Sequence, residues 1–153
     1  MRLEEVATAL AELGPRLDPV LITEFEERVA VLTFDEDTEM LLEYDKTREL
    51  LVFVGSVGAS PPRAESTMLL VFMKMNNLRE TLGGLHFAIE EEGGEFMLIW
   101  DLPYHNLTTE GLYGAIVSFR GRIEFWRQIV SDGRLDRDAI MEDGINFETM
   151  IRV

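Results

Sequence analysis

The sequence predicts an α+β fold in which a mostly antiparallel, twisted sheet packs with helices in the order α-β-β-β-α-β-β-α. Two observations support this class: apolar residues recur with helical spacing in separate segments, and short apolar runs with polar turns lie between those segments. The 153 residues are enough for one domain with a substantial core. We expect a single domain over residues 1–131, followed by an extension over residues 132–153 that is a short helix or a partly ordered tail.

The first predicted helix covers residues 2–13, and Gly14-Pro15 ends it. Its apolar side chains share one face, because they recur every three or four residues. They are Leu3, Val6, Leu10 and Leu13. A proline-containing loop is expected to follow.

Three strands are predicted next, because apolar runs rich in Val, Leu and Phe alternate with short polar links. The runs are Val29 to Phe34, Met40 to Tyr44 and Glu49 to Val57. The links, Asp35-Glu36-Asp37 and Asp45-Lys46-Thr47, are short enough for hairpin turns. The three strands should therefore form an antiparallel meander.

The second predicted helix runs from Ala64 to about Leu82 and is apolar on every side at Met68 to Met73. In a chain of this size, its own sheet covers one side, and the other side most economically meets a second copy about a twofold axis. Gly83-Gly84 should end the helix. We therefore expect a homodimer through this central helix.

A second hairpin and a last helix complete the predicted domain. Leu85 to Ile89 alternates apolar and polar residues, and Phe96 to Leu102 follows after an acidic turn. Thr108 is placed to begin a long amphipathic helix that should pack on the sheet. Its apolar positions are Leu112, Ile116, Phe119, Ile123, Trp126 and Val130. A short helix over Asp136 to Asp143 is expected beyond it.

Composition excludes several classes of function. The net charge of −15 disfavours nucleic acid and anionic membrane surfaces and favours basic partners. The longest apolar run, Met68 to Met73, is far shorter than the roughly 20 residues that span a membrane. The first residues include glutamates where a secretory signal has positive charge, and the absence of cysteine removes disulfides and thiol chemistry. We expect a soluble cytoplasmic protein.

The residues available for acid–base catalysis form no convincing site. The histidines are His86 and His105, and Pro103 breaks the helical spacing that would pair His105 with Asp101. Surface or structural roles are favoured for both histidines. An enzyme that acts on a cationic small molecule through Asp101 and His105 is therefore the least favoured hypothesis, and we expect no enzymatic activity.

Neither a metal nor another cofactor is expected. Asp35, Asp37 and Glu39 alternate like the first ligands of a calcium loop, but Met40 occupies the position that requires glycine. Gly83-Gly84 closes a helix and enters a strand, whereas a nucleotide-binding glycine motif leaves a strand and opens a helix.

The predicted strands carry an unusual amount of apolar surface. In the first and third of them, residues of both alternation classes are apolar, so both faces of the sheet need cover. Two interpretations remain open. Either the helices cover both faces as an ordinary two-sided core, or part of this surface, with a groove beside the first helix, is left for an extended segment of another protein.

Several segments are similar to one known family. Leu69 to Leu78, followed by Thr81 to Phe87, is similar to that family's central helix, with its asparagine near the C-terminal end and the glycine turn into the next strand. Phe96 to Pro103, and a last helix with Phe119 and the pair Phe125-Trp126, also fit. On these motifs, residues 1–131 resemble the class I type III secretion chaperones, the Tir-chaperone-like family.

The resemblance implies a small acidic homodimer that holds the N-terminal chaperone-binding segment of a secreted effector in extended form. It would keep the effector soluble and deliver it to the export apparatus without ATP; an export ATPase or a transcription regulator is a further candidate partner. The implied dimer interface comprises Met68, Leu69, Phe72, Met73 and Met75. The implied effector contacts are Leu3, Val6, Leu10, Leu13, Val29, Val31 and Leu51. The alternative is a dimeric regulatory or scaffold protein of the same fold that binds a folded partner.

Overall fold

The computed structural model describes residues 3–17, 21–25, 29–35, 38–90 and 94–133. The elements, in chain order, are α1 (Leu3–Leu13), the 3-10 helix η1 (Gly14–Arg16), β1 (Leu21–Phe25), β2 (Val29–Thr33), β3 (Glu39–Asp45), β4 (Leu50–Gly58), α2 (Glu65–Asn76), β5 (Leu85–Ile89), β6 (Phe96–Pro103) and α3 (Thr109–Asp132). The predicted α+β class is confirmed. The helix expected over Asp136 to Asp143 lies outside the described residues.

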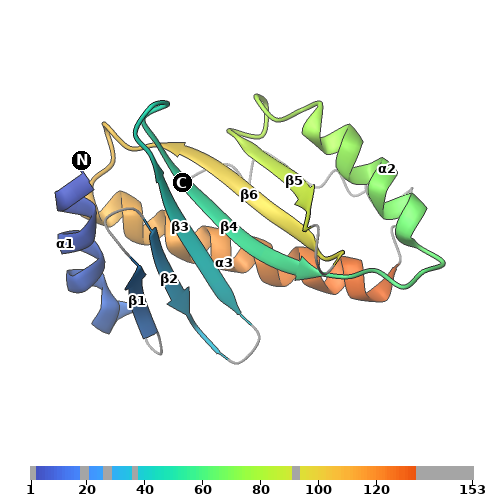
Figure 1. Ribbon diagram of the computed structural model, residues 1–153, viewed down its shortest axis with the longest axis horizontal. Coiled ribbons are helices and arrows are strands. Elements are labelled where there is room, and N and C mark those ends of the chain that lie inside the picture. Colours follow the sequence, from blue (N-terminus) through green and yellow to red (C-terminus); the bar gives the residue numbers. More distant parts are fainter. Residues whose placement is uncertain (1–2, 18–20, 26–28, 36–37, 91–93, 134–153) are drawn as a thin grey trace.

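The strands form one antiparallel sheet in the order β1-β2-β3-β4-β6-β5, so β1 and β5 are its edges (Figure 1). Strand β1 corrects the sequence-based expectation of a loop at this point. It pairs with β2 from Leu21 opposite Thr33 to Phe25 opposite Val29. The run is short and carries Thr and Glu among its apolar residues, so its strand character depends on the neighbouring β2, which no local pattern reveals.

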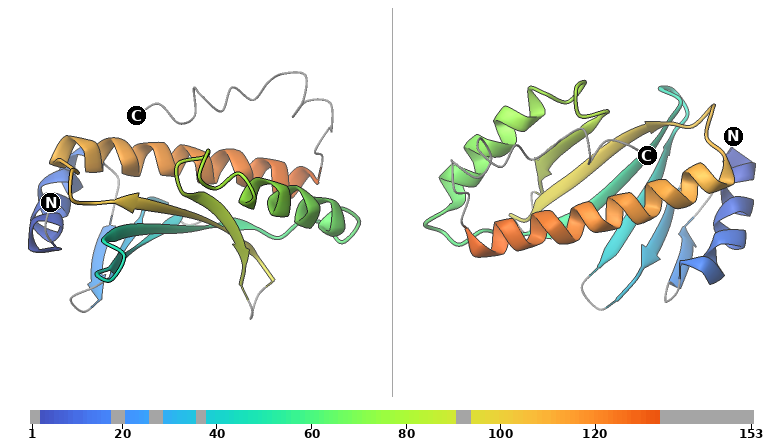
Figure 2. Two further views of the ribbon diagram at one scale, coloured as in Figure 1. Left: turned by 90° about the horizontal axis from the view of Figure 1, so that it is seen from above. Right: turned by 180° about the vertical axis from the view of Figure 1, so that it is seen from behind.

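Helix α3 packs along one face of the sheet (Figure 2). It approaches β4 closely at Gly55, where an added Cβ would lie 2.3 Å from Ile123 Cδ1. Between α3 and the sheet, the centroid of the Phe53 ring lies 5.5 Å from the ring centroids of both Trp100 and Phe119. Aromatic and branched side chains from β4, β6 and α3 therefore form the centre of the core.

Both ends of α3 are capped. The hydroxyl of Thr108 accepts a hydrogen bond from the Gly111 N–H at 3.0 Å, as predicted for a helix that begins there. Gly133, with φ 57°, ends the helix in the left-handed region. Near the start of α3, Arg16 donates two hydrogen bonds, at 2.5 and 3.0 Å, to the carboxylate of Glu110, which links η1 to α3.

Helix α2 is shorter than the sequence suggests. It ends at Asn76, and residues 77–84 continue as turns. The predicted glycine turn is present, since Gly83 and Gly84 have φ of 65° and 96°. Inside the protomer, the Phe72 ring stacks on Phe87 with 4.0 Å between their centroids, which fixes α2 against β5.

All three helices pack on the same side of the sheet. The strand register places Phe87, Leu98 and Gly55 on that side. Ile22 of β1 faces the same side, because its Cδ1 lies 3.6 Å from where a Cβ on Gly14 would be. Within the described part of the chain, no helix lies on the opposite face (Figure 2). None of the described helices has the length and hydropathy to cross a membrane.

Candidate partner-binding surfaces

A row of apolar side chains crosses the sheet on the face without helices. Directly paired residues of antiparallel strands carry their side chains on the same face. Val31 pairs with Leu41, Leu41 with Val54, and Val54 with Ile99, so the row runs from β2 to β6 without interruption. It is about 14 Å long, from three spacings between neighbouring strands. We call Val31, Leu41, Val54 and Ile99 the open-face stripe.

The open-face stripe is accessible to a partner. Its four side chains are half-buried by their neighbours in the sheet and do not pack against the core under α3. Met97, half-buried and two residues before Ile99 in β6, extends the apolar surface on one side. A contiguous apolar area of this kind on the surface of a protein is typical of an interaction site.

Carboxylates flank the open-face stripe on both sides. Glu39 and Glu43 lie two residues before and after Leu41 in β3, so they share its face of the sheet. Both side chains are exposed. The Thr33 hydroxyl lies 3.4 Å from Glu39 Oε1; among the described residues, neither carboxylate has an ion-pair partner. A ligand on the stripe therefore meets negative charge at both margins.

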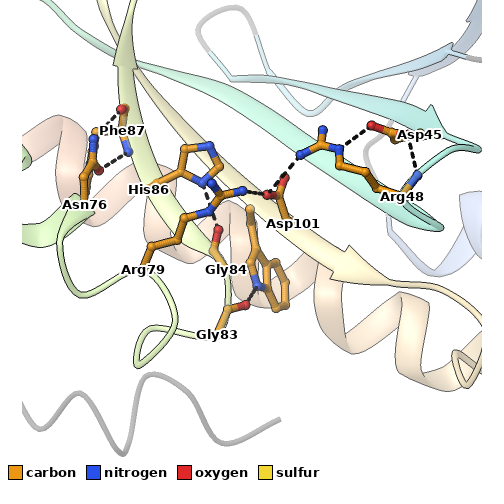
Figure 3. A network of polar contacts seen from close by, with 10 residues as sticks. Asp45, Arg48, Asn76, Arg79, Gly83, Gly84, His86, Phe87 and Asp101 are labelled. Carbon is orange, nitrogen blue, oxygen red and sulfur yellow. Dashed lines mark hydrogen bonds and ion pairs between the residues drawn. The ribbon is translucent and has the colours of Figure 1, made fainter.

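A neutralised polar cluster lies next to this surface (Figure 3). Asp101 is 8% exposed, and its Oδ2 accepts a hydrogen bond from Arg79 and lies 4.0 Å from Arg48 Nη1. Arg48 also donates through its backbone N–H and Nε to Asp45, at 2.8 and 2.5 Å. These hydrogen bonds hold the pKa of Asp45 below its usual value. The two arginines are thus occupied by acids of the same chain.

The histidines lie in separate environments. His86 Nδ1 is 2.9 Å from the carbonyl oxygen of Gly84, and burial lowers the pKa of this imidazole, with the nearby positive charges acting in the same direction. His105 Nδ1 is 4.0 Å from Glu49 Oε2. Asp101 is engaged by arginines, so these contacts give no support to the least favoured hypothesis, a catalytic site of Asp101 and His105. In the described ranges, no group of His, Cys, Asp and Glu is arranged to hold a metal.

The two edges of the sheet differ. On the outer edge of β5, the Asn76 side chain donates from Nδ2 to the Phe87 carbonyl at 2.9 Å and accepts from the Phe87 N–H at 2.7 Å. This pair of bonds closes the middle of that edge. On the other edge, β1 pairs with β2 and has no further described strand beside it. The outer backbone groups of β1 are therefore the ones placed to accept an added strand.

Helix α2 presents a second apolar surface. Leu70 and Met73, three residues apart on the side away from the core, are 44% and 70% exposed. Leu78, which follows the helix, and Ile89 at the end of β5 are also exposed. We call Leu70 and Met73 the α2 patch.

The residues implied for the dimer interface are divided between core and surface. Met68, Phe72 and Met75 are buried inside the protomer, so they do not offer a surface to a second chain as the molecule stands. Leu69 is half-buried, and Met73 belongs to the α2 patch. Leu70, which the sequence reasoning did not select, shares that patch.

Most residues implied for effector contact lie in the core. The buried ones are Val6, Leu10, Leu13 and Leu51. They pack under the helices because α1 turns its apolar face to the sheet, while its outer side carries the exposed acids Glu4, Glu5 and Glu12. Val31 belongs to the open-face stripe. The side chains of Leu3 and Val29 are not among those that the structure describes.

Sequence reasoning missed three of the four stripe residues. They are Leu41, Val54 and Ile99. The signal that could have found them is present, since both alternation classes of β4 are apolar. To decide which of the two sets of alternate β4 residues is exposed, one must know which face of the sheet α3 covers. The residue spacing within the strands does not reveal that face.

The comparisons with known proteins agree with this fold. The profile of the Tir chaperone protein (CesT) family matches residues 8–127. Among curated proteins, no sequence matches the chain.

Three solved structures are similar. The ExsC-ExsE complex contains a chain 24% identical, with a TM-score of 0.69, covering 84% of this chain and 96% of that one. The HopA1-SchA chaperone-effector complex contains a chain that is 16% identical, with a TM-score of 0.62. The match covers 82% of this chain and 95% of that one. The heterodimeric complex ExoU-SpcU from the type III secretion system of Pseudomonas aeruginosa contains a chain that is 17% identical, with a TM-score of 0.50. The match covers 80% of this chain and 95% of that one.

Proposed function

The chain belongs to the Tir chaperone protein (CesT) family, and we propose that it is a bacterial type III secretion chaperone that binds a secreted effector. One of the similar structures is a chaperone-effector complex, and another comes from a type III secretion system. The proposed role is to hold the N-terminal chaperone-binding segment of the effector in extended form, so that the effector stays soluble and competent for export.

The open-face stripe is the observation that carries this proposal. Its apolar side chains have no covering layer in the described chain, and covering apolar surface contributes roughly 25 cal/mol for each Å² removed from water. An unfolded segment has apolar side chains that need the same protection. Placing them on Val31, Leu41, Val54 and Ile99 protects both surfaces at once.

The outer edge of β1, which has no further strand beside it in the described chain, offers a second mode of contact with the effector. A chain in extended conformation can add to an open edge through backbone hydrogen bonds, which accept almost any sequence. Asn76 closes the middle of the β5 edge, so β1 is the favoured edge. Backbone pairing at β1 and side-chain contacts on the stripe together suit a chaperone whose ligand is extended.

The proposed homodimer uses the α2 patch. Leu70 and Met73 are the exposed apolar residues of α2, and a twofold axis would place each patch against its copy. Met68, Phe72 and Met75 would then support the interface from inside each protomer. This proposal keeps α2 as the dimerisation element and replaces most of the side chains that the sequence suggested for direct contact.

Binding alone accounts for the proposed role, which therefore requires neither ATP nor a catalytic residue. We place the protein in the bacterial cytoplasm, where an effector is synthesised before export. The net charge of −15 would keep a protein with exposed apolar surface from associating beyond the dimer.

The proposal is tested by co-expression with the product of the adjacent gene. The expected result is a complex of two chaperone chains with one effector, in which protease digestion leaves an N-terminal effector fragment protected. A partner that binds only as an intact folded domain would instead support a regulatory or scaffold protein of the same fold.

A further inference from the structure

We infer that the open-face stripe selects a partner segment whose apolar residues are flanked by Lys or Arg, and that Glu39 and Glu43 recognise these positive charges. The inference rests on the proposed function and adds the chemistry of the segment. It concerns a protein segment, because the row of branched side chains fits apolar side chains and the acidic margins fit cationic ones.

The register determines where the charges lie. Leu41 is the stripe residue of β3, and Glu39 and Glu43 follow on the same face at one strand repeat, about 7 Å, on either side of it. A segment that crosses the strands along the stripe therefore has one carboxylate on each side. Long Lys or Arg side chains can reach these margins while their methylene groups lie on the apolar row.

Nearby positive charge does not cancel these acids. Arg48 and Arg79 are engaged by Asp45 and Asp101. Arg127, which reaches Thr38 beside Glu39, donates to the Thr38 hydroxyl and to the Ser56 carbonyl oxygen. Within the described residues, the stripe thus presents uncompensated negative charge. Exposed charges of this kind contribute selectivity and association rate more than affinity, so the recognition should weaken with salt.

The same charges disfavour two other occupants. A second copy of this surface would bring Glu39 and Glu43 against carboxylates of the same type, and like charges facing one another are destabilising. Residues 134–153 of this chain contain three arginines against five acids, so they lack the required excess of positive charge. A basic, apolar segment of another protein is the occupant that fits.

The test uses two fluorescent synthetic peptides of about 12 residues, which span about 40 Å when extended. They share the same leucine and valine residues at alternate positions, with lysine between them in one peptide and glutamate in the other. The wild-type protein should bind the lysine peptide at least about tenfold more tightly, measured by fluorescence anisotropy at low salt.

Charge reversal gives the matched variants. The double variant Glu39→Lys/Glu43→Lys should lose the preference for the lysine peptide or invert it. The control Glu12→Lys/Glu65→Lys changes the net charge equally, at exposed positions of α1 and α2, and should keep the preference. A loss of preference in both variants would show that only the overall charge is sensed, which overturns the assignment to Glu39 and Glu43.

Other outcomes also contradict the inference. Equal binding of the two peptides, or binding of neither, would remove the proposed selectivity. Stronger binding by a chain that ends at Gly133 would identify residues 134–153 as the occupant, and dissociation of the dimer by Leu41→Asp would identify a second copy. A protein that forms the effector complex yet prefers neither peptide contradicts this inference alone and leaves the proposed function standing.

Discussion

Asn76, the last residue of α2, binds both backbone groups of Phe87 on the outer edge of β5, with distances of 2.7 Å from the Phe87 N–H and 2.9 Å to its carbonyl. The side-chain amide supplies one donor and one acceptor, as a neighbouring strand would do. It therefore ends the sheet at β5 and joins the helix to it. The position of α2, and with it the α2 patch, depends on this contact.

Replacing Asn76 with Ala should lower the free energy of unfolding by about 1 to 3 kcal/mol, because two partly buried backbone groups lose their partner. Urea denaturation followed by circular dichroism measures the change. Asn76→Asp should be intermediate, since its carboxylate still accepts from Phe87 but cannot donate. Asn77→Ala, at an exposed position, is the control and should have a smaller effect.

Dimerisation should depend on the α2 patch. Leu70→Glu and Met73→Glu place a charge at the proposed interface and should shift sedimentation from dimer to monomer while the far-ultraviolet spectrum is unchanged. Val117→Glu, at an exposed position of α3, should remain dimeric. Phe72→Asp should instead unfold the protomer, because it buries a charge against Phe87. Dimers that persist in both patch variants would place the interface elsewhere.

The turn into β5 requires glycine at position 84. Gly84 has φ 96°, and an added Cβ would lie 2.5 Å from the backbone oxygen of Asp101. Gly84→Ala should therefore lower the melting temperature clearly. Gly58→Ala shares the strain of a positive φ, 84°, but has nothing within 4 Å of the added atom, so its effect should be smaller. Equal effects of the two substitutions would mean that the close approach to Asp101 is unimportant.

Stability should respond to the protonation of His86. Burial lowers the pKa of this imidazole below 6.5, so the unfolded chain binds its proton more readily than the folded one. The folded state is then favoured above pH 6.5, and that advantage is lost as the pH falls through 6.5 toward the lower folded-state pKa. His86→Asn should therefore reduce the loss of unfolding free energy measured between about pH 7.5 and pH 5.5.

Much of the fold follows from local patterns. The strands from β2 to β6 lie within a residue or two of the predicted apolar runs, and α3 begins at its predicted cap, Thr108. These elements are long or strongly patterned, and their ends carry turn or capping residues. Strand β1 lacks such signals and exists through its pairing with β2. Helix α2 ends early because Asn76 bonds to Phe87, a tertiary contact that periodicity does not encode.

The candidate surface was less accessible to sequence reasoning. Apolar residues on both faces of β4 predicted excess surface, but they did not show which face α3 covers. That choice depends on packing, such as the approach of Ile123 to Gly55, which assigns Leu51 and Phe53 to the core. Val54 is left on the open face as a consequence. Likewise, the spacing correctly predicted an apolar face on α1. That face was assigned to partner contact, whereas in the structure it packs in the core.

The most direct test is the affinity of the purified N-terminal effector segment for the wild-type protein and for Leu41→Asp, measured by isothermal titration calorimetry. Leu41→Asp places a charge in the middle of the open-face stripe, away from the α2 patch. The variant should remain a dimer with an unchanged near-ultraviolet spectrum, and should bind the segment at least about tenfold more weakly. The control Val117→Asp should bind as the wild type does. Unchanged affinity in a folded, dimeric Leu41→Asp protein would contradict the assignment of the effector to this face.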